Sequence, residues 1–489
     1  MLKGLKEKLN LTKTANDALS YKSTTSYVLD LFALGASSRR MSRDALAELI
    51  SKALTEDFNL ALRVIFYLAD IRGGLGERDF FKLALLLISK LYPNITEKLF
   101  PLIPEYGRWD YLYIFVDTPH EEKMFKFLRE EHEQCMKNNQ TSLMYKWLKS
   151  VNASNPETNR LGKRTAKAFN LSEKEYRKLL SQKRKELKLV ERYMSQNEWE
   201  KINYEHVPSK ASILYRRAFL RHDEERYAAY IRSLRNHEVK MNTSTLYPHD
   251  IIARYIDNGL EYDETLELAW QNLPDYTEEK NDNVLSIIDV SGSMFQEVSP
   301  NSSTKAIDVA IGLGIYFAER INGPYKNHFL TFSEEPELVE IKGETLAQKI
   351  FNVSNANWGL NTNIGRVFDV ILETVLEKKL TQAELPNKLL IISDMQFDHV
   401  EGGYTPYTTF KLRYEKHGYQ LPQVIFWQVN AQRVQVPVTL LDNGTALISG
   451  YSPITLKSIL GNVIPNPYEI MLSTVMTPRY DYAIEQINK

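Results

Sequence analysis

The spacing of apolar residues gives the first half of the chain a helical character. Over residues 26–120 apolar positions recur every three or four residues, as in helices that bury one face. The pattern predicts helices over residues 27–34, 43–53, 59–71, 79–91 and 95–102. Strand-like alternation and hairpin dipeptides are missing from this stretch. Paired helices with short joints, as in an α-solenoid or an irregular bundle, are therefore expected, although no fixed repeat period is visible.

Residues 283–460 instead alternate short apolar runs with helical stretches. Strands are predicted over 283–290, 328–332, 388–393, 423–429 and 445–448, and helices over 304–321, 364–380 and from 452 to 460. This alternation is typical of a parallel, doubly wound α/β sheet. The polar segment TEEKNDN, residues 277–283, separates the halves. We therefore expect an all-helical domain over residues 1–275 and an α/β domain over residues 276–489.

Composition narrows the class of protein. A chain of 489 residues with 25% charged and 43% hydrophobic residues is long enough for two or more domains with ordinary globular cores. No apolar run approaches the roughly 18 residues of a membrane span, and the first residues lack the apolar core of a secretory signal. The lone Cys135 excludes an intrachain disulfide framework. These features predict a cytoplasmic protein without a membrane partner.

Charge is unevenly distributed although the formal net charge is only −1. Residues 156–235, the basic segment, hold 20 Lys and Arg residues against 11 Asp and Glu, and acids dominate residues 255–289. Basic residues interleaved with aromatic ones suit phosphate neutralisation combined with base stacking. The alternative is a solvated helix face with ion pairs four residues apart. The candidate RNA contacts in this segment are Lys163, Arg164, Lys183, Arg184, Lys185, Arg216 and Arg217.

A glycine-rich loop, RGGLGER, joins two of the predicted helices and adds Arg72 and Arg78 to the candidate RNA contacts. Its glycines can expose backbone N–H groups at a helix start, and two arginines beside such donors suit a phosphate. The alternative is a tight interhelical turn in which these arginines pair with Glu77 and Asp70. The loop lacks the Lys-Ser/Thr pair of a phosphate-binding loop, so nucleotide hydrolysis is not expected.

Oxygen-bearing side chains follow two predicted strands of the second half. The strand over 283–290 runs into Asp289, Ser291 and Ser293, and the strand over 388–393 runs into Asp394. Thr362, within an Asn-Thr-Asn sequence, precedes the helix predicted over 364–380. Because the carboxyl ends of parallel strands meet at one sheet edge, these side chains are expected to converge. Hard oxygen ligands of this kind favour Mg²⁺ or Mn²⁺ over zinc.

In these five positions the chain resembles the von Willebrand factor A family and its metal-ion-dependent adhesion site. The resemblance covers about residues 283–460 and implies that the two serines and the threonine bind the metal directly or through water. It implies that the two aspartates act mainly through water and through hydrogen bonds around the metal ligands, which leaves one coordination position for an outside carboxylate or phosphate. An ordinary helix-capping turn is the structural alternative. A haloacid dehalogenase-type phosphotransferase is excluded because Ser291 stands where that family needs a second acid.

A helical first half joined to such a domain resembles the Ro (TROVE) ribonucleoprotein family. The RGGLGER loop and the segments YGRWDYL and LMYKWLKSVNAS are similar to a family described only as a domain of unknown function. The Ro resemblance implies a non-enzymatic scaffold that binds structured RNA. The alternative is a metal-dependent protein-interaction or assembly module in which a partner supplies a carboxylate. An enzyme is not expected, because the metal motif leaves no obvious general base; Asp398 is the one spare carboxylate nearby.

Overall fold

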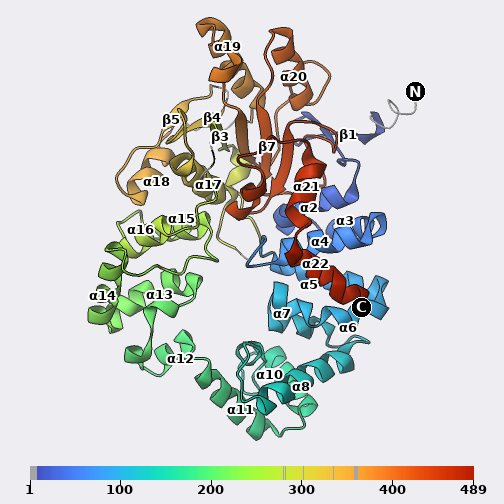
Figure 1. Ribbon diagram of the computed structural model, residues 1–489, viewed down its shortest axis with the longest axis vertical. Helices are drawn as coiled ribbons and strands as arrows, with labels where there is room; N and C mark the ends of the chain where they lie inside the picture. Colours follow the sequence, from blue (N-terminus) through green and yellow to red (C-terminus); the bar gives the residue numbers. More distant parts are fainter. Residues whose placement is uncertain (1–7, 279, 281, 301, 334, 357–361) are drawn as a thin grey trace.

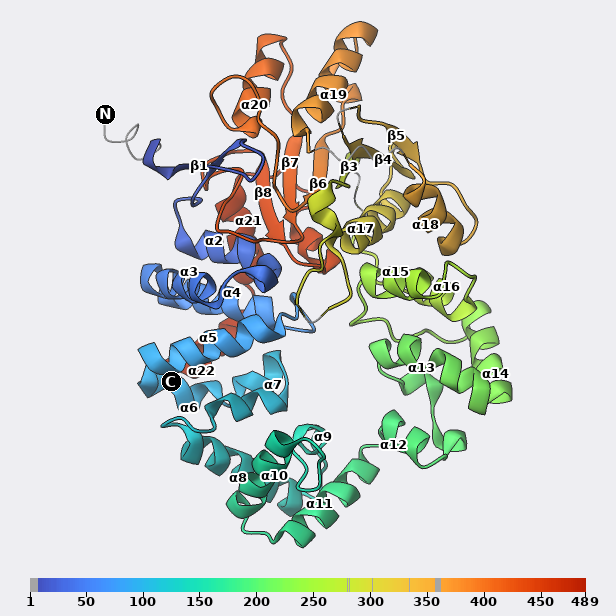
Figure 2. The ribbon, with the colours of Figure 1, turned by 180° about the vertical axis from the view of Figure 1, so that it is seen from behind.

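The chain forms a ring in which an arc of helices begins and ends on an α/β sheet (Figures 1 and 2). The computed structural model describes residues 8–278, 280, 282–300, 302–333, 335–356 and 362–489. The first helices of the arc pack on strand β8, and its last helices pack on helix α17. The two ends of the arc also meet directly, because the Tyr247 hydroxyl donates a hydrogen bond to the Leu75 carbonyl at 3.0 Å.

Helices make up the arc almost entirely. None of the helices in the described ranges is long and apolar enough to cross a membrane. The helices of the arc are α2 (Tyr27–Leu34), α3 (Arg43–Glu56), α4 (Phe58–Ala69), α5 (Arg78–Leu91), α6 (Thr96–Leu99), α7 (Leu102–Tyr106), α8 (Glu121–Lys137), α9 (Met144–Trp147), α10 (Pro156–Ala168), α11 (Glu173–Glu186), α12 (Val190–Ser195), α13 (Ser209–His222), α14 (Glu224–Arg235), α15 (Pro248–Asp257) and α16 (Glu264–Gln271).

The sheet has six strands in the order β5-β4-β3-β6-β7-β8. All neighbours pair in parallel except the edge strand β5, which is antiparallel to β4. Every residue of β3, β6 and β8 is buried, as expected for a sheet with both faces covered. The strands are β3 (Val284–Asp289), β4 (His328–Phe332), β5 (Leu338–Glu340), β6 (Lys388–Ser393), β7 (Gln423–Gln428) and β8 (Thr445–Ser449).

Helices cover the two sheet faces in a way that follows from strand alternation. On one face Trp427 of β7 contacts Phe317 of α17 (Ala306–Arg320), with ring centroids 5.7 Å apart. The preceding residue, Phe426, points to the opposite face and contacts Tyr407 of α20 (Pro406–Lys416). The remaining helices of this half are α18 (Leu346–Ser354), α19 (Ile364–Lys378), α21 (Pro467–Val475) and α22 (Pro478–Asn488).

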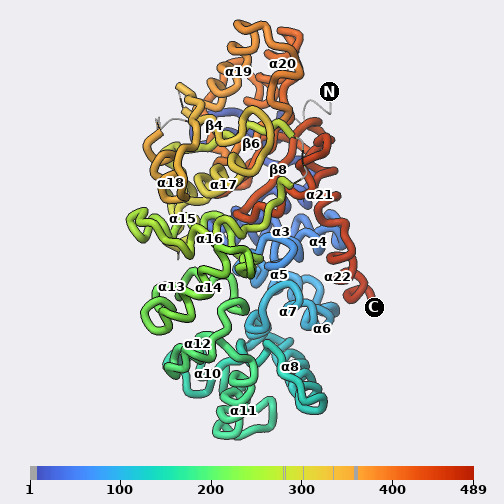
Figure 3. Tube along the Cα trace, turned by 60° about the vertical axis from the view of Figure 1, so that its left-hand side comes forward, coloured from blue at the N-terminus to red at the C-terminus, as the bar shows by residue number. Residues whose placement is uncertain are grey.

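Both ends of the chain cross the boundary predicted near residue 276. The N-terminal hairpin, β1 (Leu11–Lys13) and β2 (Leu19–Tyr21), lies on the α/β half, where Tyr21 and Val436 exchange two backbone hydrogen bonds of 3.0 Å. Helix α22 leaves the α/β half and packs along α4 and α6 (Figure 3). The division at residue 276 stays a prediction, but neither half is built from one uninterrupted stretch of chain.

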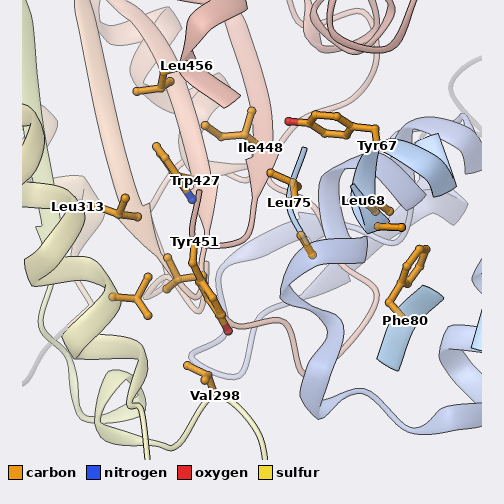
Figure 4. Packing of buried hydrophobic residues seen from close by; sticks show 14 of the residues in the cluster. Tyr67, Leu68, Leu75, Phe80, Val298, Leu313, Trp427, Ile448, Tyr451 and Leu456 are labelled. Carbon is orange, nitrogen blue, oxygen red and sulfur yellow. The ribbon is translucent and has the colours of Figure 1, made fainter. Parts of the chain in front are cut away.

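One continuous apolar cluster joins the sheet to the first helices of the arc. Tyr67 and Leu75 face Ile448 and Tyr451 across this junction (Figure 4). Trp427 is fully buried there, and its indole N–H donates to the Gly450 carbonyl at 2.7 Å. Buried aromatic residues with satisfied polar atoms contribute strongly to packing. The position of the arc on the sheet is therefore fixed by core packing rather than by surface contacts.

The fold class expected from the sequence is confirmed. The predicted ranges 27–34, 328–332 and 388–393 coincide with α2, β4 and β6. The helix predicted over 95–102 is wrong, because Pro101 interrupts it and the chain forms the two short helices α6 and α7. The stretch 452–460 forms a 3₁₀ helix over Pro453–Ser458. The N-terminal hairpin, β5, α18, α20, α21 and α22 were not predicted.

Candidate metal centre and basic surfaces

Asp289 ends strand β3 at the carboxyl edge of the sheet, and two neighbouring loops hold its carboxylate. Its Oδ1 accepts a hydrogen bond from the backbone N–H of Ser291 at 2.9 Å, and its Oδ2 accepts one from the Ser393 hydroxyl at 2.5 Å. The residue is fully buried, and burial raises the pKa of its carboxyl group. The turn after β3 and the end of β6 thus fix this carboxylate in one orientation.

Ser291 and Ser293 lie in the turn after Asp289, where a short 3₁₀ helix spans Gly292–Phe295. Their hydroxyl oxygens are 3.1 Å apart. A side chain added at Gly292 would meet no atom of the described residues within 4 Å, so the outer side of the turn is open. The two hydroxyls therefore lie side by side next to a turn that a ligand can approach.

Asp394 follows strand β6 and brings a second buried carboxylate to the same edge. Its Oδ1 accepts a hydrogen bond from the Gln396 backbone N–H at 3.2 Å. Its Oδ2 is buried and has no hydrogen-bond partner among the described residues. Burial is the main cause that raises the pKa of the Asp394 carboxyl to about 7, and the negative charge of Asp289 adds to it. Two buried carboxyl groups that repel each other, with one oxygen unsatisfied, are an arrangement that a bound cation would stabilise.

Thr362 is held at the same edge by residues from two distant segments. Its backbone N–H donates to Asp398 Oδ2 at 3.0 Å, and its hydroxyl donates to Asp398 Oδ1. Asn16, from the N-terminal segment, donates to the Thr362 hydroxyl oxygen at 2.6 Å and to the Gln396 carbonyl at 2.9 Å. The expectation that Asp398 is a spare carboxylate is wrong, because it binds the Thr362 loop. Residue 361 of the Asn-Thr-Asn sequence lies outside the described residues.

Asn16 is a residue of this site that the sequence did not reveal. It lies 346 positions before Thr362, outside the α/β half, in a stretch without any metal-binding pattern. The neighbouring Thr14 hydroxyl donates to the Phe397 carbonyl at 2.6 Å, so the whole segment is fixed against the Asp394 loop. Only the packing of the N-terminal hairpin on the sheet brings this amide to the threonine.

The donor set fits a hard divalent cation. Within the described ranges no group of three or more His, Cys, Asp or Glu side chains has the geometry of a metal site. A zinc centre of Cys and His or a calcium centre of several acids is therefore not offered there. The sheet edge instead combines two carboxylates with three hydroxyl groups, from Asp289, Ser291, Ser293, Thr362 and Asp394. Oxygen ligands with two negative charges suit Mg²⁺ or Mn²⁺.

The two candidate RNA-binding arginines of the glycine-rich loop are in different environments. Arg78 is exposed, and Arg72 donates to the Glu105 carbonyl at 2.9 Å. The interpretation that these arginines pair with Glu77 and Asp70 is wrong. Glu77 accepts two hydrogen bonds from Arg39, at 2.7 and 2.9 Å, and Asp70 accepts hydrogen bonds from Arg479.

The candidate contacts of the basic segment divide into structural and exposed side chains. Arg216 is buried against Asp263, with Nε and Oδ2 2.6 Å apart, and Lys183 is buried beside Glu186. Arg184 donates to two backbone carbonyls and to the Ser150 hydroxyl. Arg164 pairs with Asp117 and Glu121, and Lys163 lies 3.7 Å from Glu173. Lys185 and Arg217, each next to a structural cation, are exposed.

A basic groove of about 600 Å³ lies on this segment between α11 and α12. Its cations are Arg177, Lys178, Arg184 and Arg192, and its single acid among the described residues is Glu191. Arg177 and Lys178 are exposed and form no ion pair within the described ranges.

The aromatic residues Tyr204 and Phe219 of the basic segment pack on each other, with ring centroids 5.2 Å apart, and are buried. These two rings therefore stabilise the fold and are not available to stack on bases.

Two family models match separate parts of the chain. The model for the domain of unknown function DUF2828 matches residues 14–96 and 133–287, and the model for the domain of unknown function DUF7788 matches residues 283–476. The two matches meet where strand β3 begins.

Two proteins are similar to the chain over most of its length. The uncharacterised protein L728 of Acanthamoeba polyphaga mimivirus is 27% identical over 512 residues, covering 95% of this chain and 87% of its own. The crystal structure of the Deinococcus radiodurans RO (RSR) protein superposes with a TM-score of 0.51 and 16% identity, covering 93% of this chain and 99% of the RO chain. At that identity the likeness concerns the fold, and this chain shares the overall architecture of the Ro protein.

Proposed function

We propose that the protein is a non-enzymatic, Ro-like scaffold that binds structured RNA on its helical arc and a divalent cation at the sheet edge. The observation that carries the RNA part is the basic groove, in which Arg177 and Lys178 are exposed and form no ion pair within the described ranges. Cationic side chains without a protein partner neutralise phosphates and release counterions, which makes binding depend steeply on salt. The fold that this chain shares with the Ro protein supports the proposal of a Ro-like scaffold.

Salt-dependent binding of a structured RNA hairpin, followed by fluorescence anisotropy, tests the RNA part. Exchanging both Arg177 and Lys178 for Gln should weaken binding at low salt. It should also flatten the slope of log K against log salt by about one unit for each phosphate that is no longer neutralised. Lys411→Gln, an exposed lysine on helix α20, is the matched control and should keep the wild-type slope. An affinity that does not respond to salt, or equal weakening in the groove and control variants, would remove the RNA proposal.

Buried cations next to exposed ones offer an internal comparison. Lys185→Gln and Arg217→Gln should change RNA affinity while leaving thermal stability unchanged, because both side chains are exposed. Arg216→Gln should instead lower thermal stability, because it leaves Asp263 without its buried partner. The reverse pattern, with stability reduced in the exposed variants, would contradict the placement of these side chains.

The cation part of the proposal is supported by the buried, unpartnered Asp394 Oδ2 beside Asp289. Asp289, Ser291, Ser293, Thr362 and Asp394 would hold Mg²⁺ or Mn²⁺, which when bound would present an electropositive position to an outside carboxylate or phosphate. The side chains of this chain orient the site. Ser393 and the Ser291 N–H hold Asp289, whereas Asp398 and Asn16 hold Thr362.

Thermal unfolding with increasing Mg²⁺ tests the cation site. A ligand that binds only the folded state stabilises it by about 2.7 kcal/mol at 100 times its dissociation constant. Wild type should show this rise, and Ser291→Ala and Asp394→Asn should lose it. Thr374→Ala removes an exposed hydroxyl on helix α19 and should keep the rise. If all three variants gain the same stability from Mg²⁺, the site is wrongly assigned.

A metal-dependent protein-interaction module is the second candidate. It is favoured by Phe295, an apolar side chain that is 48% exposed in the turn carrying Ser291 and Ser293. A partner that supplies a carboxylate to the cation could cover this ring. Binding of a protein partner that is abolished both with EDTA and in Asp289→Ala, together with no RNA binding, would favour this function. RNA binding that persists under both treatments would favour the scaffold.

A further inference from the structure

A second cavity lies at the seam where the ring closes, and neither proposed function uses it. This seam cavity has a volume of about 770 Å³, within the range of small-molecule sites. Three parts of the ring line it: the first helices of the arc, the last helices of the arc, and the α/β half through Ser299, Thr304 and Tyr451. A molecule bound there would contact both ends of the arc together with the sheet.

The seam cavity carries an excess of positive charge. Its five cations are Arg39, Arg43, Arg78, Lys82 and Lys210, and its three acids among the described residues are Glu77, Asp79 and Asp250. Each acid already has a cation, in the pairs Arg39–Glu77, Lys82–Asp79 and Lys210–Asp250. Arg43 and Arg78 are exposed and have no ion-pair partner within the described ranges. Two positive charges therefore remain without a protein anion.

The start of helix α5, a helix of 14 residues, faces the same cavity. Its N-cap residue Glu77 makes no capping hydrogen bond, because Arg39 binds the Glu77 carboxylate. Within the described ranges the backbone N–H groups of Arg78, Asp79 and Phe80 have no acceptor. Free N–H groups at a helix N-terminus, together with the helix dipole, attract anions.

Two buried polar atoms in the lining of the seam cavity also lack partners, and they belong to neighbouring rings whose centroids are 5.2 Å apart. His249 Nδ1 and the Tyr451 hydroxyl form no hydrogen bond with the described residues, although the two residues are only 8% and 2% exposed. Both line the seam cavity, and the Tyr451 hydroxyl lies at the end of the ring away from Trp427 (Figure 4). Burial lowers the pKa of His249 to about 4, so its imidazole is neutral at pH 7. Each group can therefore donate a hydrogen bond to a ligand oxygen.

We propose that the seam cavity binds a phosphate monoester, the dianionic group of a nucleotide. Arg43, Arg78 and the first N–H groups of α5 neutralise the phosphate, and His249 and Tyr451 donate to its oxygens or to those of the attached group. The two unpaired cations match the charge of −2, whereas a phosphodiester carries only −1. A free mononucleotide and the terminal phosphate of an RNA strand supply the same chemistry. Either one would hold the ends of the arc together.

Calorimetric titration of the full chain with AMP, in EDTA-containing buffer, tests the site without the metal centre. AMP should bind and adenosine should not. Arg43→Gln and Arg78→Gln should each weaken AMP binding at least tenfold, because each removes charge-assisted hydrogen bonds. Both side chains are exposed, so the variants should keep their fold, and circular dichroism checks this. Arg232→Gln, an exposed arginine of α14 outside the cavity, should bind AMP like wild type.

Competition separates the two sources of the phosphate. An RNA oligonucleotide with a 5′-phosphate should displace AMP if the cavity accepts a strand end, and the same RNA with a 5′-hydroxyl should not. If neither displaces AMP, the site takes a free nucleotide. Bound AMP should also slow hydrogen exchange in both Arg78–Leu91 and Ser209–His222. If no phosphorylated probe binds, or if adenosine binds as well as AMP, or if the two arginine variants bind normally, the proposal is overturned.

Discussion

The C-terminal helix α22 is anchored to the arc by ion pairs of Arg479 and Asp481, and these two anchors should differ greatly in strength. Asp70, in the segment after α4, is fully buried, and its carboxylate accepts hydrogen bonds from Arg479, from the Tyr480 hydroxyl at 3.3 Å and from the Arg72 N–H at 3.0 Å. Asp481, two residues after Arg479, pairs with Arg63 at 2.5 Å, but its side chain is 43% exposed. Asp70→Ala and Asp481→Ala therefore remove anchors of the same helix in contrasting environments.

The magnitudes follow from the exposure of each partner. Removing one member of a buried pair costs about 3–5 kcal/mol, since the other charge stays desolvated. The Arg479 side chain is 32% exposed and also lies 3.3 Å from Glu105, so the lower end, about 3 kcal/mol, applies to Asp70→Ala. Asp481→Ala removes a carboxylate that is 43% exposed and accepts a single hydrogen bond among the described residues, from Arg63. About 1 kcal/mol is expected for this change, although the Arg63 side chain itself is only 12% exposed.

Native-state hydrogen exchange over Pro478–Asn488 measures the local stability directly, without requiring two-state unfolding of the whole chain. Asp70→Ala should reduce protection of α22 by a factor on the order of 100, and Asp481→Ala by a factor of about 5. A drop below about fivefold in Asp70→Ala, or equal drops in the two variants, would refute the reasoning from burial.

Two further predictions follow from the same kind of close packing and burial. Gly314→Ala on α17 should lower the free energy of unfolding by about 1–3 kcal/mol, because the added Cβ would overlap with Ile288 Cδ1. Gly292→Ala should be tolerated, because its added Cβ meets no atom of the described residues within 4 Å. Equal melting temperatures for the two variants would contradict the close packing of α17 on β3. The pKa of His249 is lowered to about 4 by burial, from an ordinary value of 6.5. The neutral, buried His249 side chain therefore contributes its full stabilisation above pH 6.5, and this contribution is lost as the pH falls through 4. Amide exchange of Pro248–Asp257 should therefore lose up to about 3 kcal/mol of protection on acidification in wild type, and clearly less in His249→Gln.

The order of elements in the α/β half could be predicted because it depends on local patterns. A continuous apolar run such as residues 388–393 forms a strand buried on both faces, and the run ends where Asp394 begins the loop. Parallel pairing then places Asp289 and Asp394 at one sheet edge, since β3 and β6 are neighbours. The edge strand β5 was missed because three residues with exposed ends carry too short a pattern.

The candidate RNA contacts show the limit of sequence patterns. Lys183, Arg184 and Lys185 are consecutive, yet the first is buried, the second binds backbone carbonyls and the third is exposed. On a helix, consecutive residues point in directions about 100° apart, so a run of charges does not define a surface. Which of these cations is exposed depends on the neighbouring helix against which each one packs.

The sequence by itself determined the helical and α/β halves and the five oxygen-bearing side chains, because periodicity and strand ends are local properties of the chain. Only the tertiary structure decided that the arc closes on the sheet, that Asn16 donates a hydrogen bond to Thr362, and that Asp70 pairs with Arg479. Each of these contacts joins residues hundreds of positions apart. Such pairs form because packing of apolar faces leaves them adjacent, and no spacing along the chain records which faces will meet.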